Sequence, residues 1–108
     1  MAEIVWSDPA LADLEAIGDW IALQDPVAAA NLVHRVLDHV AQLADHPESG
    51  SRVRELKRSR YRQLVEPPCR VFYRFDGRTV FILQVMRSER VLRQRRLDPR
   101  PGGPRSKR

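Results

Sequence analysis

Arginine is the residue type that most clearly suggests a chemical role in this sequence. Five arginines fall within the segment CRVFYRFDGRTVFILQVMRSER, at Arg70, Arg74, Arg78, Arg87 and Arg90. Positive charge gathered in this way suits a polyanionic partner, or an acidic protein that covers the same surface. The first question is therefore how strands that should form a core can accommodate so much charge.

Few other residues offer recognisable chemistry. His34 and His39 are five positions apart, so they do not share a helical face as a metal-binding pair at i, i+4 would. With His46, they are expected to be solvated side chains of a helix or its end. The single cysteine, Cys69, cannot form an internal disulfide and is expected to pack at a strand start. No Ser-His-Asp set, glycine-rich phosphate loop or CxxC pair is present, so we predict neither a metal site nor a cofactor.

The net charge of +5 conceals a strong asymmetry along the 108 residues. Residues 1–50 hold nine acidic residues and one arginine, which gives −8. Residues 51–92 hold eleven basic and four acidic residues, which gives +7, and residues 93–108 add a further +6. One half of the fold should therefore be acidic and the other half basic.

Two segments carry the same helix-start signal, an aspartate followed by proline. Asp8 before Pro9 and Asp25 before Pro26 are expected to cap two helices that form a hairpin. Gly18 should lie on the inner side of the first helix and let the second approach closely. Apolar residues recur at helical spacing after each start: Ala10, Leu11, Leu14, Ile17, Gly18 and Ile21, then Ala29, Leu32, Val33, Val36, Leu37, Val40 and Leu43.

The remaining segments have the features of strands. Asp76-Gly77 is predicted to form a two-residue type I′ turn between the two strongest strands. Pro67 and Pro68 should end the strand before them, because proline cannot donate to a ladder. The predicted strands are residues 3–6, 61–65, 69–75 and 78–86, and residues 52–56 form either a short strand or a connector.

This turn predicts which side chains share a face of the sheet. Phe72 would lie opposite Phe81, and Val71 opposite Ile82. The face that packs under the helices would carry Val71, Tyr73, Phe75, Val80, Ile82, Gln84 and Met86. The other face would carry Arg70, Phe72, Arg74, Thr79, Phe81, Leu83, Val85 and Arg87. The arginines would thus project from the uncovered side of a helix-backed sheet, beside apolar side chains that mark an interaction site or lie under the C-terminal tail.

Four segments, taken in order, resemble the RelE/ParE superfamily of bacterial type II toxins, and most closely its ParE branch. The likeness covers about residues 3–92, and no single motif carries it. The segments are WSDPALADLEAIGDWIALQDPVAAANLVHRV, HPESGSRVREL, YRQLVEPPCRVFYRFDG and VFILQVMRSER. The resemblance implies an α+β fold, with an N-terminal strand and two-helix hairpin packed on one face of a twisted antiparallel sheet. It also implies a cognate antitoxin as partner.

The superfamily divides by activity, and each branch implies a different target. RelE-like members cleave mRNA on the ribosome, and Arg70, Arg87 and Arg90 are the candidate catalytic residues for that reaction. Leu64, Val65 and Glu66 stand where those enzymes tend to carry lysines, and no Tyr or His follows Arg90. ParE-like members instead poison DNA gyrase without evident side-chain chemistry. We favour the ParE reading, which makes the protein a binding poison rather than an enzyme; a non-toxic interaction module is a third alternative.

These expectations assign surfaces and a domain organisation. Residues 1–92 are predicted to form one domain, and residues 93–108 a basic, largely disordered tail. A cytoplasmic location without a membrane segment is expected. The target or nucleic-acid surface is predicted at Arg62, Arg70, Arg74, Arg87 and Arg90. The antitoxin-binding surface is predicted at Phe72, Phe81, Leu83 and Val85.

Overall fold

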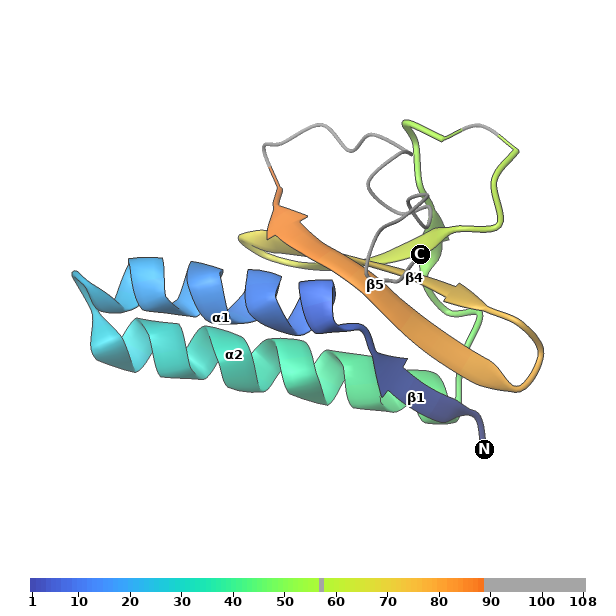
Figure 1. Cartoon of the computed structure of the whole chain (residues 1–108), viewed down its shortest axis with the longest axis horizontal. Helices are drawn as coiled ribbons and strands as arrows, with labels where there is room; N and C mark the ends of the chain where they lie inside the picture. The colour runs from blue at the N-terminus through green and yellow to red at the C-terminus, as the bar shows by residue number, and fades with distance from the viewer. Residues whose placement is uncertain (57, 89–108) are drawn as a thin grey trace.

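The computed structural model describes residues 1–56 and 58–88 of the chain. Two helices lie side by side against one face of a five-stranded sheet, the α+β arrangement that the sequence predicts (Figure 1). The helices are α1 (Asp8–Ala22) and α2 (Pro26–Ala41), followed by the short helix η1 (Gln42–Ala44). The strands are β1 (Glu3–Trp6), β2 (Ser51–Arg52), β3 (Arg62–Glu66), β4 (Cys69–Phe75) and β5 (Thr79–Arg87).

The sheet is mixed rather than wholly antiparallel. Its strand order is β1-β5-β4-β3-β2, and β1 runs parallel to β5 while the other neighbours are antiparallel. The chain reaches this parallel pairing by passing through the helical hairpin and then three strands. We call the face of the sheet that packs on α1 and α2 the inner face, and the opposite one the outer face.

Side-chain caps begin both helices, although one cap differs from the prediction. The hydroxyl of Ser7, not the carboxylate of Asp8, accepts from Ala10 N at 3.1 Å, so the expectation for Asp8 was wrong by one residue. Serine in an extended conformation before the first turn meets the same requirement for an acceptor. Asp25 caps α2 as expected, accepting from Ala28 N at 3.0 Å.

A glycine sets the spacing of the two helices. Gly18 is buried in α1, and a Cβ atom added there would lie 3.3 Å from Val33 Cγ2 on α2. This confirms the expectation that Gly18 allows a close approach. The cost of glycine in a helix interior is about 1 kcal/mol.

The turn between β4 and β5 is shifted by one residue from the prediction. Phe75 pairs with Val80, and Asp76 N donates to Thr79 O, so the two loop residues are Gly77 and Arg78. Gly77 adopts a φ of +99°, which glycine tolerates without strain. The carboxylate of Asp76 accepts from the amides of Thr79 and Arg78, and these hydrogen bonds lower its pKa.

The main core lies between the helices and the inner face. Its buried residues come from both helices, from η1 and from β3, β4 and β5. They are Ala10, Leu14, Leu32, Val36, Val40, Leu43, Leu64, Cys69, Val71, Tyr73, Val80, Ile82 and Val85. The burial of Cys69 matches the packing role that the sequence predicts.

Candidate target and antitoxin surfaces

A β-bulge in β5 decides which side chains reach each face. Tyr73 pairs with Ile82 but Phe72 pairs with Gln84, so Leu83 is an extra residue on β5. An extra residue reverses the alternation of side chains beyond it. The predicted pairs of Phe72 with Phe81 and of Val71 with Ile82 were wrong because the turn is shifted: Phe81 pairs with Arg74 and Ile82 with Tyr73.

Four face assignments on β5 are corrected by this bulge. Gln84 and Met86 lie on the outer face, whereas simple alternation predicted them on the inner face. Val85 and Arg87 lie on the inner face, and Val85 joins the main core at 3% exposure. Val85 N also donates to Asp13 Oδ2 on α1 at 3.1 Å, which ties the strand beyond the bulge to the helix.

Arg70 lies on the outer face, away from the helices, as predicted, but it is 5% exposed. Its Nη1 and Nη2 donate to the two carboxylate oxygens of Glu55 at 2.8 and 2.7 Å. Its Nε donates to Gln63 Oε1 at 2.8 Å, and its guanidinium lies 4.8 Å from the ring centre of Phe72. The charge of Arg70 is therefore matched within the protein.

A second, smaller core covers this part of the outer face. Val53, Leu56 and Tyr61, from the segment between β2 and β3, pack against Phe72 and Met86. Figure 1 shows this segment, in green, on the side of the sheet opposite the helices. Phe72 is fully buried as a result, so two of the four residues predicted to bind an antitoxin, Phe72 and Val85, are inaccessible in this conformation.

The accessible part of the outer face lies towards the β4–β5 turn. Arg74 stacks on Phe81, with its guanidinium 4.3 Å from the ring centre. Val5 of β1 pairs with Phe81 in parallel register, so it shares this face, and it is 38% exposed. Leu83, Arg74 and Phe81 are each partly exposed. We call these four residues the Arg74 patch: Val5, Arg74, Phe81 and Leu83.

The other predicted basic residues do not join this patch. Arg87 lies on the inner face and stacks on Trp20 of α1, 4.3 Å from the ring centre. Arg62 pairs with Tyr73, which places it on the inner face, where its Nη1 donates to Gly50 O at 2.9 Å. Arg90 lies outside the described residues. The four described arginines of the predicted surface are thus divided between two faces, with Arg70 and Arg74 on the outer one.

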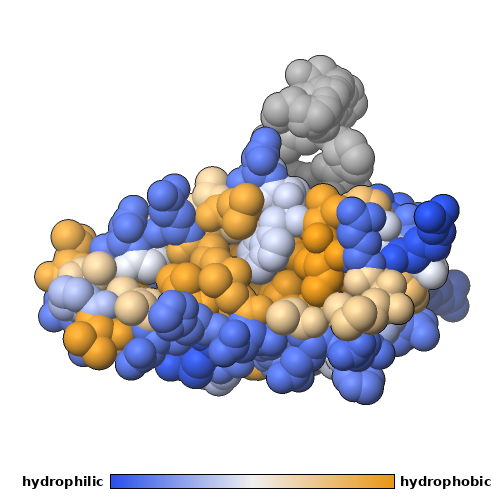
Figure 2. Space-filling model, turned by 90° about the horizontal axis from the view of Figure 1, so that it is seen from below, coloured by the Kyte–Doolittle hydropathy of each residue, from blue (hydrophilic) through white to orange (hydrophobic). Residues whose placement is uncertain are grey.

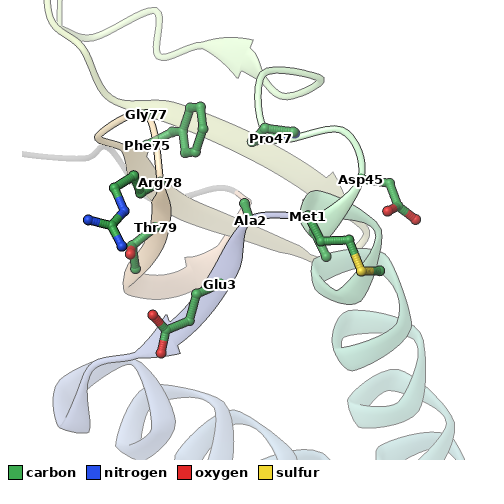
Figure 3. Close-up of a pocket in the computed structure, with 10 residues that line it drawn as sticks. Met1, Ala2, Glu3, Asp45, Pro47, Phe75, Gly77, Arg78 and Thr79 are labelled. Atoms are coloured by element: carbon green, nitrogen blue, oxygen red, sulfur yellow. The ribbon is translucent and has the colours of Figure 1, made fainter.

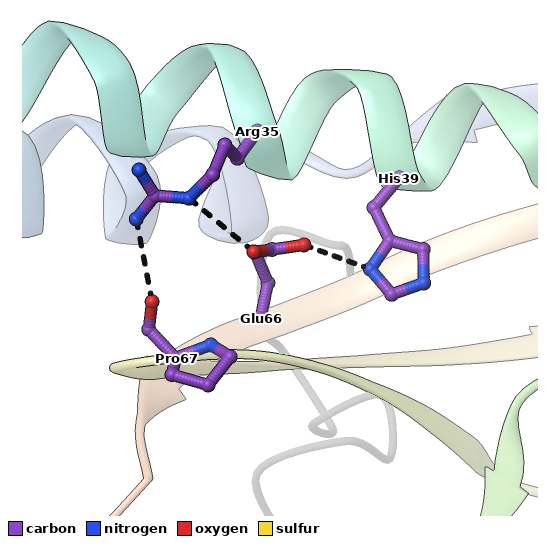
Figure 4. Close-up of polar contacts among 4 residues, drawn as sticks. All are labelled: Arg35, His39, Glu66 and Pro67. Carbon is purple, nitrogen blue, oxygen red and sulfur yellow. Dashed lines mark hydrogen bonds and ion pairs between the residues drawn. The ribbon is translucent and has the colours of Figure 1, made fainter.

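An ion-pair cluster fixes α2 to the end of the sheet (Figure 4). Glu66 Oε2 lies 3.3 Å from Arg35 Nε, and Glu66 Oε1 lies 3.1 Å from His39 Nδ1. Arg35 Nη2 also donates to Pro67 O at 3.4 Å. His39 is therefore a partner of Glu66, a contact that the expectation of a simply solvated histidine missed.

Two hollows lie away from the outer face. An apolar groove of about 840 Å³ runs along the outside of the helical hairpin, and Figure 2 shows the apolar surface between its polar margins. Leu11 and Leu37 are 47% and 41% exposed in this groove. A more polar hollow of about 550 Å³ lies where β1 and η1 meet the β4–β5 turn (Figure 3). Its charged side chains are Glu3, Asp45 and Arg78.

The described residues contain no group of three or more His, Cys, Asp or Glu side chains placed to hold a metal ion. None of their helices is long and apolar enough to cross a membrane. What the site offers is a binding surface: a stacked arginine and aromatic ring beside apolar side chains, next to a buried arginine that is paired with a carboxylate.

Comparison with known proteins places this fold among bacterial toxins. The structure is similar to the chromosomal ParDE toxin–antitoxin system from P. aeruginosa, with a TM-score of 0.70 and 28% identity over 82% of this chain and 98% of that one. Its fold also matches the toxin–antitoxin complex RelBE2 from Mycobacterium tuberculosis, with a TM-score of 0.59 and 20% identity, over 80% of this chain and 96% of that one.

Sequence comparison identifies the family. Residues 4–92 match the family model of the ParE toxin of type II toxin–antitoxin systems. The toxin RelE2 from Caulobacter vibrioides is 37% identical over 84% of this chain and all of its own length. A putative toxin, Y4kP, from Sinorhizobium fredii is 41% identical over 77% of this chain and 84% of its own length. The chain belongs to the ParE toxin family.

Proposed function

We propose that this protein is a ParE-like toxin that inhibits DNA gyrase and is neutralised by a cognate antitoxin. The family match supports a toxin paired with an antitoxin. The gyrase target is favoured because, among the described residues, the outer face offers a binding surface without an exposed Tyr or His beside its arginines.

The state of Arg70 is the observation that carries this proposal. Cleavage of RNA needs a cation free to stabilise the phosphate, and usually a nearby general acid or base. Here Glu55 and Gln63 engage the guanidinium of Arg70, which is 5% exposed. The three histidines lie on or after α2, which packs on the inner face.

A supercoiling assay with purified gyrase tests the target. We expect the protein to block supercoiling and to accumulate cleaved DNA, and we expect Arg74→Glu to reduce both effects about tenfold, as loss of an interface arginine commonly does. Asp38→Arg is the control for a charge reversal, since Asp38 is exposed on α2 and the change should leave inhibition unchanged. Full gyrase activity at a large excess of folded protein would exclude this target.

A ribosome-dependent mRNA endonuclease is the second candidate. The observation in its favour is that Arg70 and Arg74 share the outer face, as a phosphate-binding site would require. Toe-printing of translating ribosomes distinguishes it, because new cuts that disappear in Arg70→Ala would establish the nuclease. If induced expression without a partner leaves growth normal, the protein is instead a non-toxic interaction module.

The antitoxin is proposed to bind the Arg74 patch. The exposed apolar side chains of Phe81 and Leu83 beside a cation suit an acidic, amphipathic segment that folds on binding. Co-expression with the adjacent open reading frame should restore growth. Phe81→Asp should weaken the complex at least tenfold in titration calorimetry, whereas Leu37→Asp in the helical groove is the matched control. Equal losses of affinity in the two variants would show that the antitoxin binds a different surface.

A further inference from the structure

We propose that the free edge of β1 pairs with the same edge of a second copy of this chain. The two strands run antiparallel about a two-fold axis at Val5, and the contact joins two sheets into one. This interaction does not depend on gyrase as the target or on the antitoxin surface.

The backbone of β1 has free hydrogen-bonding groups along one side. β1 is the first strand in the order of the sheet and borders it, with β5 as its neighbour (Figure 1). Glu3 N donates to Arg78 O at 3.1 Å and Ser7 N to Ile82 O at 3.0 Å, so the odd-numbered amides face β5. Alternation along the strand then points the N–H and C=O groups of Ile4 and Trp6 away from the sheet. Within residues 1–56 and 58–88, these four groups have no hydrogen-bond partner.

One register satisfies all four groups. Ile4 lies opposite Trp6 of the second copy, and this pair exchanges two N–H···O bonds, as does its symmetry mate. A register centred on Ile4 would pair Trp6 with Ala2, whose amide already donates to Ala44 O at 2.8 Å. A register centred on Trp6 would require Asp8, the first residue of α1. A two-fold axis that brings the same patch of both copies together therefore passes beside Val5.

The side chains of β1 suit this pairing. Ile4 and Trp6 pack against the main core but stay partly exposed, and in this register each covers the other across the two copies. Pairs of an aromatic with a β-branched residue stabilise antiparallel strands. Val5, 38% exposed, meets Val5 of the second copy in a non-hydrogen-bonded pair, where side chains approach most closely. Glu3, the charged residue of this strand, lies opposite Ser7, so like charges remain apart.

β1 also lacks the features that protect an edge strand. Proline, lysine, a bulge or a very short strand commonly prevents pairing between sheets. The opposite edge, β2, has two residues and carries Arg52. By contrast, β1 has four residues without proline or lysine, and its register with β5 is regular. Because Val5 belongs to the Arg74 patch, pairing would merge two such patches into one surface.

A cysteine trap tests the register. Full-chain Val5→Cys is treated with copper phenanthroline, and we expect a disulfide-linked dimer because the two Cβ atoms lie about 4.5–5.5 Å apart. Glu3→Cys is the matched control: it lies on the same face of the same strand, but its two copies are roughly 14 Å apart. The natural Cys69 is buried and should not react. Equal cross-linking of the two variants, or none in Val5→Cys, would overturn the register.

Sedimentation of the untrapped chain tests the association itself. A contact of four residues per copy is small, so we expect a reversible dimer of wild type with a Kd on the order of 10–100 µM. Val5→Lys should raise this Kd at least tenfold, because two ammonium groups meet at the axis. Val27→Lys, at a position 70% exposed on α2, is the matched control and should leave the Kd unchanged. A wild-type chain that stays monomeric up to about 500 µM, or equal weakening by the two lysines, would overturn the proposal.

Discussion

Tyr73 shows how a single side chain organises the chain around it. Its hydroxyl donates to Pro47 O and accepts from Gly50 N, both at 2.9 Å, and it is fully buried. A Cβ atom at Gly50 would lie 2.6 Å from this hydroxyl, so the turn after η1 and the tyrosine fit only with glycine there. These contacts fix the path of the chain where it passes from the helix layer to the outer face of the sheet.

Replacing Tyr73 by phenylalanine should lower the free energy of unfolding by about 1–3 kcal/mol, because an amide and a carbonyl lose their partner. Burial raises the pKa of Tyr73 above its usual 10.0. The unfolded chain therefore loses this proton first, and stability falls as the pH rises above about 10. Between pH 8 and 11, urea denaturation should show a smaller fall in the free energy of unfolding for Tyr73→Phe than for wild type. If the free energy of unfolding depends on pH in the same way in the two proteins, this account is contradicted.

At the scale of elements, the α1–α2 contact depends on the absence of one methyl group. Gly18→Ala offers about 1 kcal/mol of helix propensity, but the new methyl group crowds Val33. We expect Gly18→Ala to be more favourable in a Val33→Ala background than in wild type, by about 0.5–1 kcal/mol. A double-mutant cycle by urea denaturation measures this coupling. Additive effects would show that the two helices accommodate the new methyl group without a free-energy cost.

The sequence predicted the elements well because each has a local signal. Proline after aspartate marked both helix starts, and Asp76-Gly77 marked the hairpin within one residue. The same reasoning failed at Leu83, since a bulge depends on how two strands meet and leaves no periodic trace. That one residue exchanged the faces of Val85 and Arg87 with those of Gln84 and Met86.

The candidate site was less predictable than the fold for a related reason. The sequence placed Arg70 and Arg74 correctly on the face away from the helices. It could not show that Glu55, fifteen residues from Arg70, would lie against that arginine, because loop contacts follow no spacing rule. The apolar residues Val53, Leu56 and Tyr61 gave a weak signal, because apolar side chains in a connecting segment need a surface to pack against.

At the scale of the whole molecule, charge separates by layer. The acidic residues 1–50 supply both helices, while the basic residues 51–92 supply four of the five strands, so these 92 residues together carry −1. The overall +5 therefore depends on residues 93–108. Attraction to polyanions should then have a local part, from the Arg74 patch, and a diffuse part, from the tail.

A chain that ends at Leu92 separates these two parts. We expect its free energy of unfolding to stay within about 0.5 kcal/mol of the full chain, since the tail holds few apolar residues. Its elution from a heparin column should move to lower salt, because seven basic side chains are removed. Unchanged elution would assign polyanion binding to the folded layers alone, and a large loss of stability would show that the tail belongs to the fold.

The parallel pairing of β1 with β5 joins the beginning of the described chain to its end. Ile4 lies beside Val80, and Ser7 N donates to Ile82 O. During translation, β1 therefore waits without its neighbour until residues 79–87 have emerged, and β5 is the last of the described strands to be made. A nascent toxin would remain inactive until β5 has been made, which gives a pre-existing inhibitor time to meet it as it folds.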